Sequence, residues 1–146
     1  MEQSNKAKFF MTVTIVATIF ILISGPLLAH TVIYILVQVF SLLLIIWALI
    51  TRQVSKDHKK HDLPGGYFFI TEGPYEIVRH PIYVGYLLIM ISLVEMEFTF
   101  LRIIALLLIL GMIVLKIIRE EHTLVEEVKE YHDYKAKTKA LIPFLL

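Results

Sequence analysis

The stretch VIYILVQVFSLLLIIWALI, residues Val32–Ile50, contains 19 consecutive residues without a charged side chain. A helix of about 20 predominantly apolar residues is long enough to cross the hydrocarbon core of a bilayer. The composition of the whole chain agrees, because 58% of its 146 residues are hydrophobic and its mean hydropathy is +0.75. A soluble domain has roughly 45–50% apolar residues. The sequence therefore predicts an integral membrane protein.

Three further apolar runs flank this stretch. Phe9–Ala29 precedes it, and Ile82–Val94 and Ile103–Leu115 follow it. The last two have 13 residues each without a charge, about 20 Å of helix. They can span if their helices extend at both ends and if the charged residues between them, Glu95, Glu97 and Arg102, lie at the far interface and pair there. A hairpin that crosses only part of the bilayer is the alternative.

We expect an all-α single domain over residues 1–146, with about four transmembrane helices at about 9–29, 32–50, 81–95 and 98–118. A tail helix is expected at about 119–138, because Leu124, Val128, Tyr131 and Tyr134 recur at helical spacing among Glu and Lys residues. Thirteen of the 14 Lys and Arg residues, all except Arg102, fall on one side of the four predicted helices. The positive-inside rule then predicts that both termini and the long middle loop are cytoplasmic.

The composition excludes several classes of function. The formal net charge is +1, so nucleic acid is not an expected partner, since its binding site would be a basic stripe. The chain has no cysteine, which excludes disulfides and thiolate nucleophiles. His58 and His61 form an H-x-x-H spacing in a Lys-rich loop, but a catalytic zinc site usually has three protein ligands, and we expect no metal.

Between the second and third runs, the stretch GPYEIVRHPIYVG, Gly73–Gly85, combines turn residues with charged and aromatic side chains. Pro81 suits the first position of a helix, and a helix start offers unpaired N–H groups to an anion. Arg79 and His80 precede that start, while Tyr75 and Tyr83 offer aromatic faces to a cation. A zwitterionic or sulfonium-bearing ligand would fit these groups. The alternative is that they only anchor the chain at the membrane interface.

Two adjacent carboxylates, Glu120 and Glu121, directly follow the fourth run. If the third and fourth helices form a hairpin, these carboxylates reach the same level as Arg79 and His80. Ionisable pairs at a membrane boundary favour a functional site. The alternative is a solvated stretch of helix.

Taken together, RHP-x-Y-x-G, an apolar hairpin, EE and a tail with two tyrosines and Leu141-Ile142-Pro143 resemble the isoprenylcysteine carboxyl methyltransferase and phospholipid methyltransferase superfamily. The resemblance covers roughly residues 67–144. It implies a membrane enzyme that binds S-adenosylmethionine from the cytosolic side and methylates a lipophilic substrate arriving from the bilayer. An NADPH-dependent membrane reductase and a non-enzymatic four-helix membrane protein are the two other readings.

The resemblance also implies site residues. Those for the cofactor are Tyr67, Phe68, Phe69, Ile70, Tyr75, His80, Pro81, Ile82, Tyr83 and Glu120. Those for the reaction are Arg79, Lys116, Arg119 and Glu121, with Lys116 or Arg119 as the cation for a substrate carboxylate. An amine acceptor would need a base, Glu121 or His80, whereas a carboxylate acceptor would not. The sequence leaves the acceptor open between a prenylated cysteine, a phospholipid amine and a small hydrophobic acid, and it leaves the oligomeric state undetermined.

Overall fold

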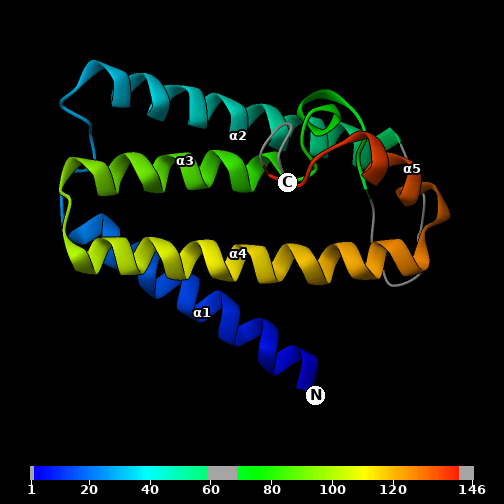
Figure 1. Cartoon of the computed structure of the whole chain (residues 1–146). Coiled ribbons are helices and arrows are strands. Elements are labelled where there is room, and N and C mark those ends of the chain that lie inside the picture. Colours follow the sequence, from blue (N-terminus) through cyan, green and yellow to red (C-terminus); the bar gives the residue numbers. More distant parts are fainter. Residues whose placement is uncertain (1, 59–68, 142–146) are drawn as a thin grey trace. The chain divides into compact units, whose positions relative to one another are not determined.

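The structure, a computed structural model, describes residues 2–58 and 69–141 (Figure 1). Within them the chain forms five α-helices and a short 3-10 helix, which confirms the all-α prediction. The helices are α1 (Glu2–Ile23), α2 (Val32–His58), η2 (Gly73–Glu76), α3 (Pro81–Met96), α4 (Phe100–Glu127) and α5 (Lys129–Lys137).

The helix boundaries differ from the predicted ones at four places, the first being the start of α1 at Glu2 and not at residue 9. α1 ends at Ile23 and not at residue 29, because Gly25 and Pro26 disfavour the helix that precedes them. α2 continues beyond Ile50 to His58, since the polar residues that follow are compatible with a helix. The predicted boundary near residue 118 is wrong, because α4 runs to Glu127 and the tail helix begins only after Val128, which has an extended backbone with φ −128° and ψ 106°.

Among the described residues, two helices are long and apolar enough to cross a membrane. They are α2 over Val32–Ser55 and α4 over Phe100–Glu126, each with a mean hydropathy of 2.7. α3 and the apolar part of α1, Lys8–Ile23, are shorter apolar helices. By this criterion of length and composition, two of the four predicted spans are supported.

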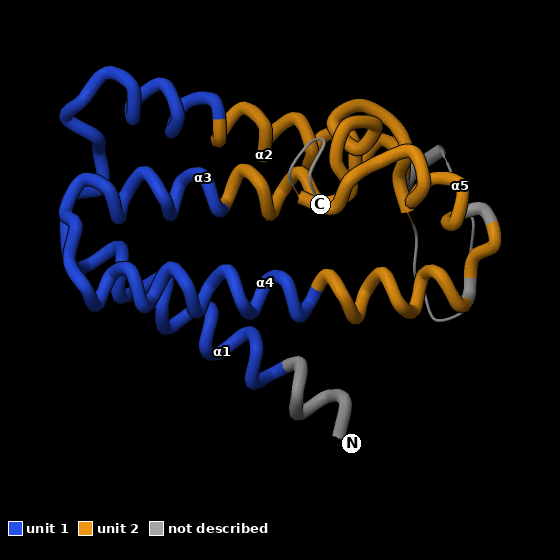
Figure 2. Tube along the Cα trace, viewed as in Figure 1, with its two compact units in different colours: residues 1–40, 87–116 blue, residues 41–86, 117–146 orange. Residues whose placement is uncertain are grey.

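The chain divides into two compact units, which Figure 2 shows in different colours. Unit 1 comprises Met1–Phe40 and Leu87–Lys116, and unit 2 comprises Ser41–Tyr86 and Ile117–Leu146. The boundaries fall inside α2, α3 and α4. Each of these helices therefore contributes residues to both units.

Unit 1 contains a buried arginine, Arg102, in the first turn of α4. The Arg102 side chain is 1% exposed, and its NH2 group donates to the backbone oxygen of Leu93 at 2.6 Å. Its NH1 atom lies 3.5 Å from Glu97 Oε2, which confirms the pairing expected for these residues. A Cβ built on Gly25 would lie 1.8 Å from Arg102 NH1. The guanidinium therefore occupies space that only a glycine at position 25 leaves open.

Unit 2 brings α2 and α3 into close contact at a glycine. A Cβ built on Gly85 would lie 2.6 Å from Ile45 Cγ1 and 2.9 Å from the backbone oxygen of Ser41. Real Cβ atoms essentially never approach other atoms this closely. Gly85 therefore lets α3 pack against α2.

Two small cores of unit 2 hold the loop and the tail. The first contains Ala48, Ile70 and Tyr75, with Ile82 packed against it. The second contains Leu124, Val128, Tyr131 and Tyr134, with Phe69 and Val125 packed against it. Apolar packing thus holds the segment around Phe69 and Ile70, the 3-10 helix η2 and the tail in one unit.

Candidate active site

The segment between η2 and α3 lies beside the end of the tail. α3 begins at Pro81, as predicted, directly after Arg79 and His80. The backbone N–H of Arg79 donates to the oxygen of Lys139 at 2.8 Å, and that of His80 donates to the oxygen of Ala140 at 3.2 Å. Arg79 and His80 directly precede the helix start that was predicted to bind an anion. Their backbone N–H groups thus donate to carbonyl groups of the tail.

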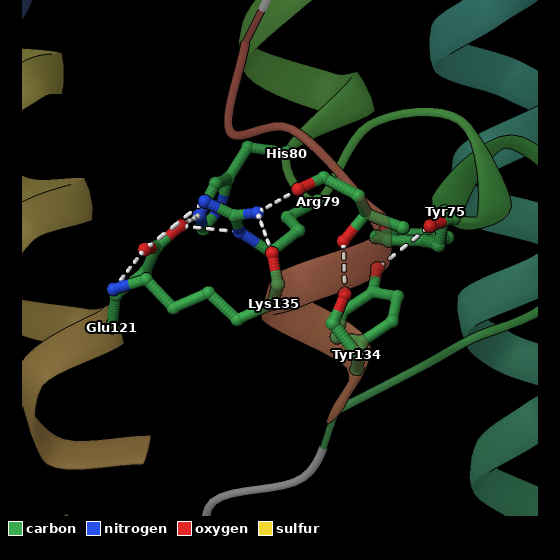
Figure 3. A network of polar contacts seen from close by, with 7 residues as sticks. Tyr75, Arg79, His80, Glu121, Tyr134 and Lys135 are labelled. Atoms are coloured by element: carbon green, nitrogen blue, oxygen red, sulfur yellow. Dashed lines mark hydrogen bonds and ion pairs between the residues drawn. The ribbon is translucent and has the colours of Figure 1, made fainter. Parts of the chain in front are cut away.

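Arg79 and Glu121 form a buried, two-pronged ion pair (Figure 3). Arg79 Nε donates to Glu121 Oε1 at 2.6 Å, and Arg79 NH2 donates to Glu121 Oε2 at 3.2 Å. The two side chains are 7% and 8% exposed. Arg79 NH1 donates to the backbone oxygens of Lys135 and Thr138. Four hydrogen bonds from one guanidinium therefore join the start of α3, the end of α4 and the tail.

Two more groups contact the Glu121 carboxylate. Lys135 Nζ lies 3.0 Å from Oε2, and His80 Nε2 lies 3.4 Å from Oε1. Because a carboxylate only accepts hydrogen bonds, His80 Nε2 carries the proton in this contact. The His80 ring stacks on Tyr83 with a centroid separation of 5.7 Å and an interplanar angle of 19°. Glu121 thus holds the orientation of the ring that stacks on Tyr83.

An aromatic cluster lies next to these charges. Phe69 packs on Tyr131 and Tyr134, with centroid separations of 5.5 Å and 5.8 Å. Tyr134 donates its hydroxyl to the backbone oxygen of Tyr75 at 2.7 Å. Burial is the main cause that raises the pKa of both Tyr131 and Tyr134. Both hydroxyls are therefore protonated donors at neutral pH.

The charges of Arg52 and Glu120 both act on Tyr75, whose backbone oxygen accepts the hydrogen bond of Tyr134. Burial raises the pKa of Tyr75, the positive charge of Arg52 opposes that rise, and the negative charge of Glu120 adds to it. Glu120 is therefore near enough to act on the Tyr75 hydroxyl. The structure distinguishes the two adjacent carboxylates, since Glu120 is half-buried while Glu121 is buried in the ion pair.

Most of the predicted site residues lie in unit 2. The described ones there are Phe69, Ile70, Tyr75, Arg79, His80, Pro81, Ile82, Tyr83, Arg119, Glu120 and Glu121. Arg119 is exposed on α4, and Lys116 is exposed at the end of the part of α4 that belongs to unit 1. Tyr67 and Phe68 lie outside the described residues. Phe69, one of the residues predicted to bind the cofactor, packs on the tail tyrosines Tyr131 and Tyr134.

The role of Lys135 in this site was not predicted from the sequence. This residue lies one residue after Tyr134, which belongs to the tail pattern, but several other basic residues surround it in the sequence. Among the described residues there is no group of three or more His, Cys, Asp or Glu side chains that could hold a metal ion. His61 of the H-x-x-H spacing lies outside the described residues.

The family model described as isoprenylcysteine carboxyl methyltransferase (ICMT) family matches residues 15–126. Comparison with curated proteins and with solved structures gives no significant match. The matched range is more than half of the chain and contains Tyr75, Arg79, His80, Tyr83 and Glu121, whereas α5 lies outside it. The chain therefore belongs to the isoprenylcysteine carboxyl methyltransferase family, which comprises membrane-embedded methyltransferases that use S-adenosylmethionine.

Proposed function

We propose that this protein transfers the methyl group of S-adenosylmethionine to the carboxylate of a lipophilic acceptor of the prenylated-cysteine type. One observation carries the choice of a carboxylate over an amine. Both oxygens of Glu121, one of the two residues predicted to be a base, are already bound by Arg79, His80 and Lys135, and Nε2 of His80, the other one, donates to Glu121.

An amine acceptor must lose a proton before or during methyl transfer, so it needs a base within hydrogen-bond reach. Glu121 Oε1 accepts from Arg79 and His80, and Oε2 accepts from Arg79 and Lys135. The carboxylate is thus engaged in holding its neighbours. A carboxylate acceptor is already a nucleophile and needs only orientation and a dry site, which suits a Glu121 that positions other groups.

The residues present fit S-adenosylmethionine. Its positive groups match the aromatic faces of Tyr75 and Tyr83 and the carboxylate of Glu120, and its negative group matches a lysine beside Glu121. When bound, this cofactor supplies a methyl group made electrophilic by the sulfonium. We assign its binding to Tyr75, His80, Pro81, Ile82, Tyr83 and Glu120, with Phe69 and Ile70 beside them.

Arg79 takes a positioning role in this proposal. Its guanidinium donates four hydrogen bonds to oxygens of the chain itself. Arginine has five N–H donors, so little capacity remains for a substrate. Arg79 instead fixes Glu121, which in turn holds the His80 ring against Tyr83.

The test is methylation of two acceptors by the purified protein in lipid nanodiscs. Radiolabelled S-adenosylmethionine is supplied with N-acetyl-S-farnesylcysteine or with phosphatidylethanolamine. We expect label in the first acceptor only, in a form that mild alkali releases as methanol, because a methyl ester hydrolyses and an N-methyl group does not. Alkali-stable label in the phospholipid would refute the proposed acceptor. Heat-denatured protein is the control.

We also propose that both termini and the loop between α2 and α3 face the cytoplasm, from the distribution of basic residues. The chain has no cysteine, so single cysteines report the side directly. Gln53→Cys and Lys137→Cys replace exposed residues, as does Thr99→Cys in the turn between α3 and α4. A thiol reagent that does not cross membranes should label Thr99→Cys alone in intact cells. Equal labelling of Gln53→Cys would contradict the orientation.

A further inference from the structure

We propose that the Lys135 ammonium binds the carboxylate of a ligand in the active site. This inference rests on the proposed function, and it replaces Lys116 and Arg119 in the role that the sequence suggested for them. Lys135 Nζ lies 3.0 Å from Glu121 Oε2, in the same group of charges as Arg79.

The charges around Glu121 do not balance within the chain itself. Arg79 and Lys135 both contact the single carboxylate of Glu121. Arg79 already neutralises the charge of that carboxylate, so the positive charge of Lys135 is left over. Arg52 and Glu120, whose charges both act on Tyr75, have opposite signs. One further negative charge would therefore neutralise this group of side chains, and a ligand carboxylate supplies it.

The Lys135 side chain is accessible to a ligand, whereas that of Arg79 is not. The Arg79 side chain is 7% exposed, while the Lys135 side chain is 44% exposed. An ammonium group has three donors, and among the described residues the contact of Lys135 Nζ is the one with Glu121. Two donors thus remain for a ligand.

Contacts with Arg79 and Glu121 also fix the position of Lys135. The backbone oxygen of Lys135 accepts a hydrogen bond from Arg79 NH1 at 3.3 Å, so the residue is held at both its backbone and its ammonium. A lysine fixed in this way loses less side-chain freedom when it binds a ligand, which favours binding. Lys137, two residues further along α5, is exposed, and it offers a matched control.

Two carboxylates are candidates, that of the acceptor and that of the methionine part of the cofactor. The experiment separates them. Dissociation constants are measured for N-acetyl-S-farnesylcysteine, for its primary amide and for S-adenosylhomocysteine, with the parent protein, Lys135→Gln and Lys137→Gln. The amide has the shape of the acid without its charge. The ratio of the two constants therefore reports recognition of the acceptor carboxylate alone.

We expect the parent and Lys137→Gln to bind the acid more tightly than the amide. In Lys135→Gln the ratio of the two dissociation constants, amide over acid, should fall about tenfold, the value of a charge-assisted hydrogen bond in a partly exposed site. The dissociation constant of the amide should be the same in Lys135→Gln as in the parent. A general structural defect would instead weaken the binding of both the amide and the acid. A similar loss for S-adenosylhomocysteine, with the acid preference retained, would assign Lys135 to the cofactor carboxylate. If Lys135→Gln matches Lys137→Gln for all three compounds, the inference is wrong. A parent protein that prefers the amide would refute the proposed acceptor instead.

Discussion

Replacement of Arg79 by alanine should release the tail from the rest of unit 2. Arg79 and Glu121 are 7% and 8% exposed, and removing one partner of a buried ion pair costs about 3–5 kcal/mol. Lys135 and His80 remain on Glu121, so we expect the lower end, about 3 kcal/mol. The substitution also removes the two hydrogen bonds from Arg79 to carbonyl groups of the tail. The equilibrium for opening of the tail should therefore rise by roughly a hundredfold.

Limited digestion with trypsin measures this opening, because the tail contains Lys135, Lys137 and Lys139. When a segment opens and closes faster than the protease cuts, the cleavage rate follows the open fraction. We expect tail cleavage in Arg79→Ala to be up to about a hundredfold faster than in the parent. Arg119→Ala is the control, since it removes the same charge from an exposed side chain of α4. Equal rates for Arg79→Ala and Arg119→Ala would show that the ion pair does not hold the tail.

Three further predictions use thermal unfolding in one detergent. Gly85→Ala should destabilise the protein by about 1–3 kcal/mol, because the added Cβ meets a backbone oxygen of α2. Gly111→Ala, whose Cβ would meet nothing within 4 Å, should be neutral or stabilising by up to about 1 kcal/mol; the reverse order of these two variants would contradict the packing. Gly25→Ala should cost about 2 kcal/mol by displacing the buried guanidinium of unit 1 and its hydrogen bond, and an unchanged midpoint would argue against that contact. Burial raises the pKa of Tyr131 and Tyr134, so their contribution to stability is complete below the unfolded pKa of about 10 and is lost as pH rises above it. The unfolding midpoint of Tyr134→Phe should then fall less steeply with alkaline pH than that of the parent, and parallel curves would count against the burial.

The start of α3 and the pairing of the motif residues were predictable because the signals are local. Pro81 marks the first residue of α3. The charged residues before it, Arg79 and His80, contact Glu121 of α4, as the predicted hairpin requires. The end of α4 was not predictable in the same way. No glycine or proline lies near Val128, and its extended backbone accompanies burial of its side chain with Leu124 and the tail tyrosines. Tertiary packing decides that break.

The roles of Glu120 and Glu121 show a second limit of the sequence. Neighbouring side chains on a helix point about 100° apart, so only one of two adjacent carboxylates can face a given partner. Which one does so depends on the rotation of α4, and the sequence does not specify that rotation to within one residue. The structure turns Glu121 to Arg79. Lys135 was missed for a related reason, since its contact with Glu121 depends on how α5 packs.

The contacts of Arg79 have a consequence for the order of events during synthesis. Its partners Glu121 and Thr138 follow it by 42 and 59 residues. At about 5–20 residues per second, a ribosome needs roughly 3–12 s to add the 59 residues from Arg79 to Thr138. Until the first 42 of these residues have been added, the guanidinium has neither its carboxylate nor its carbonyl groups, and it must stay hydrated. The start of α3 therefore enters its final buried environment only after α4 has been made, and assembly of the active site is a late step in the biosynthesis of this protein.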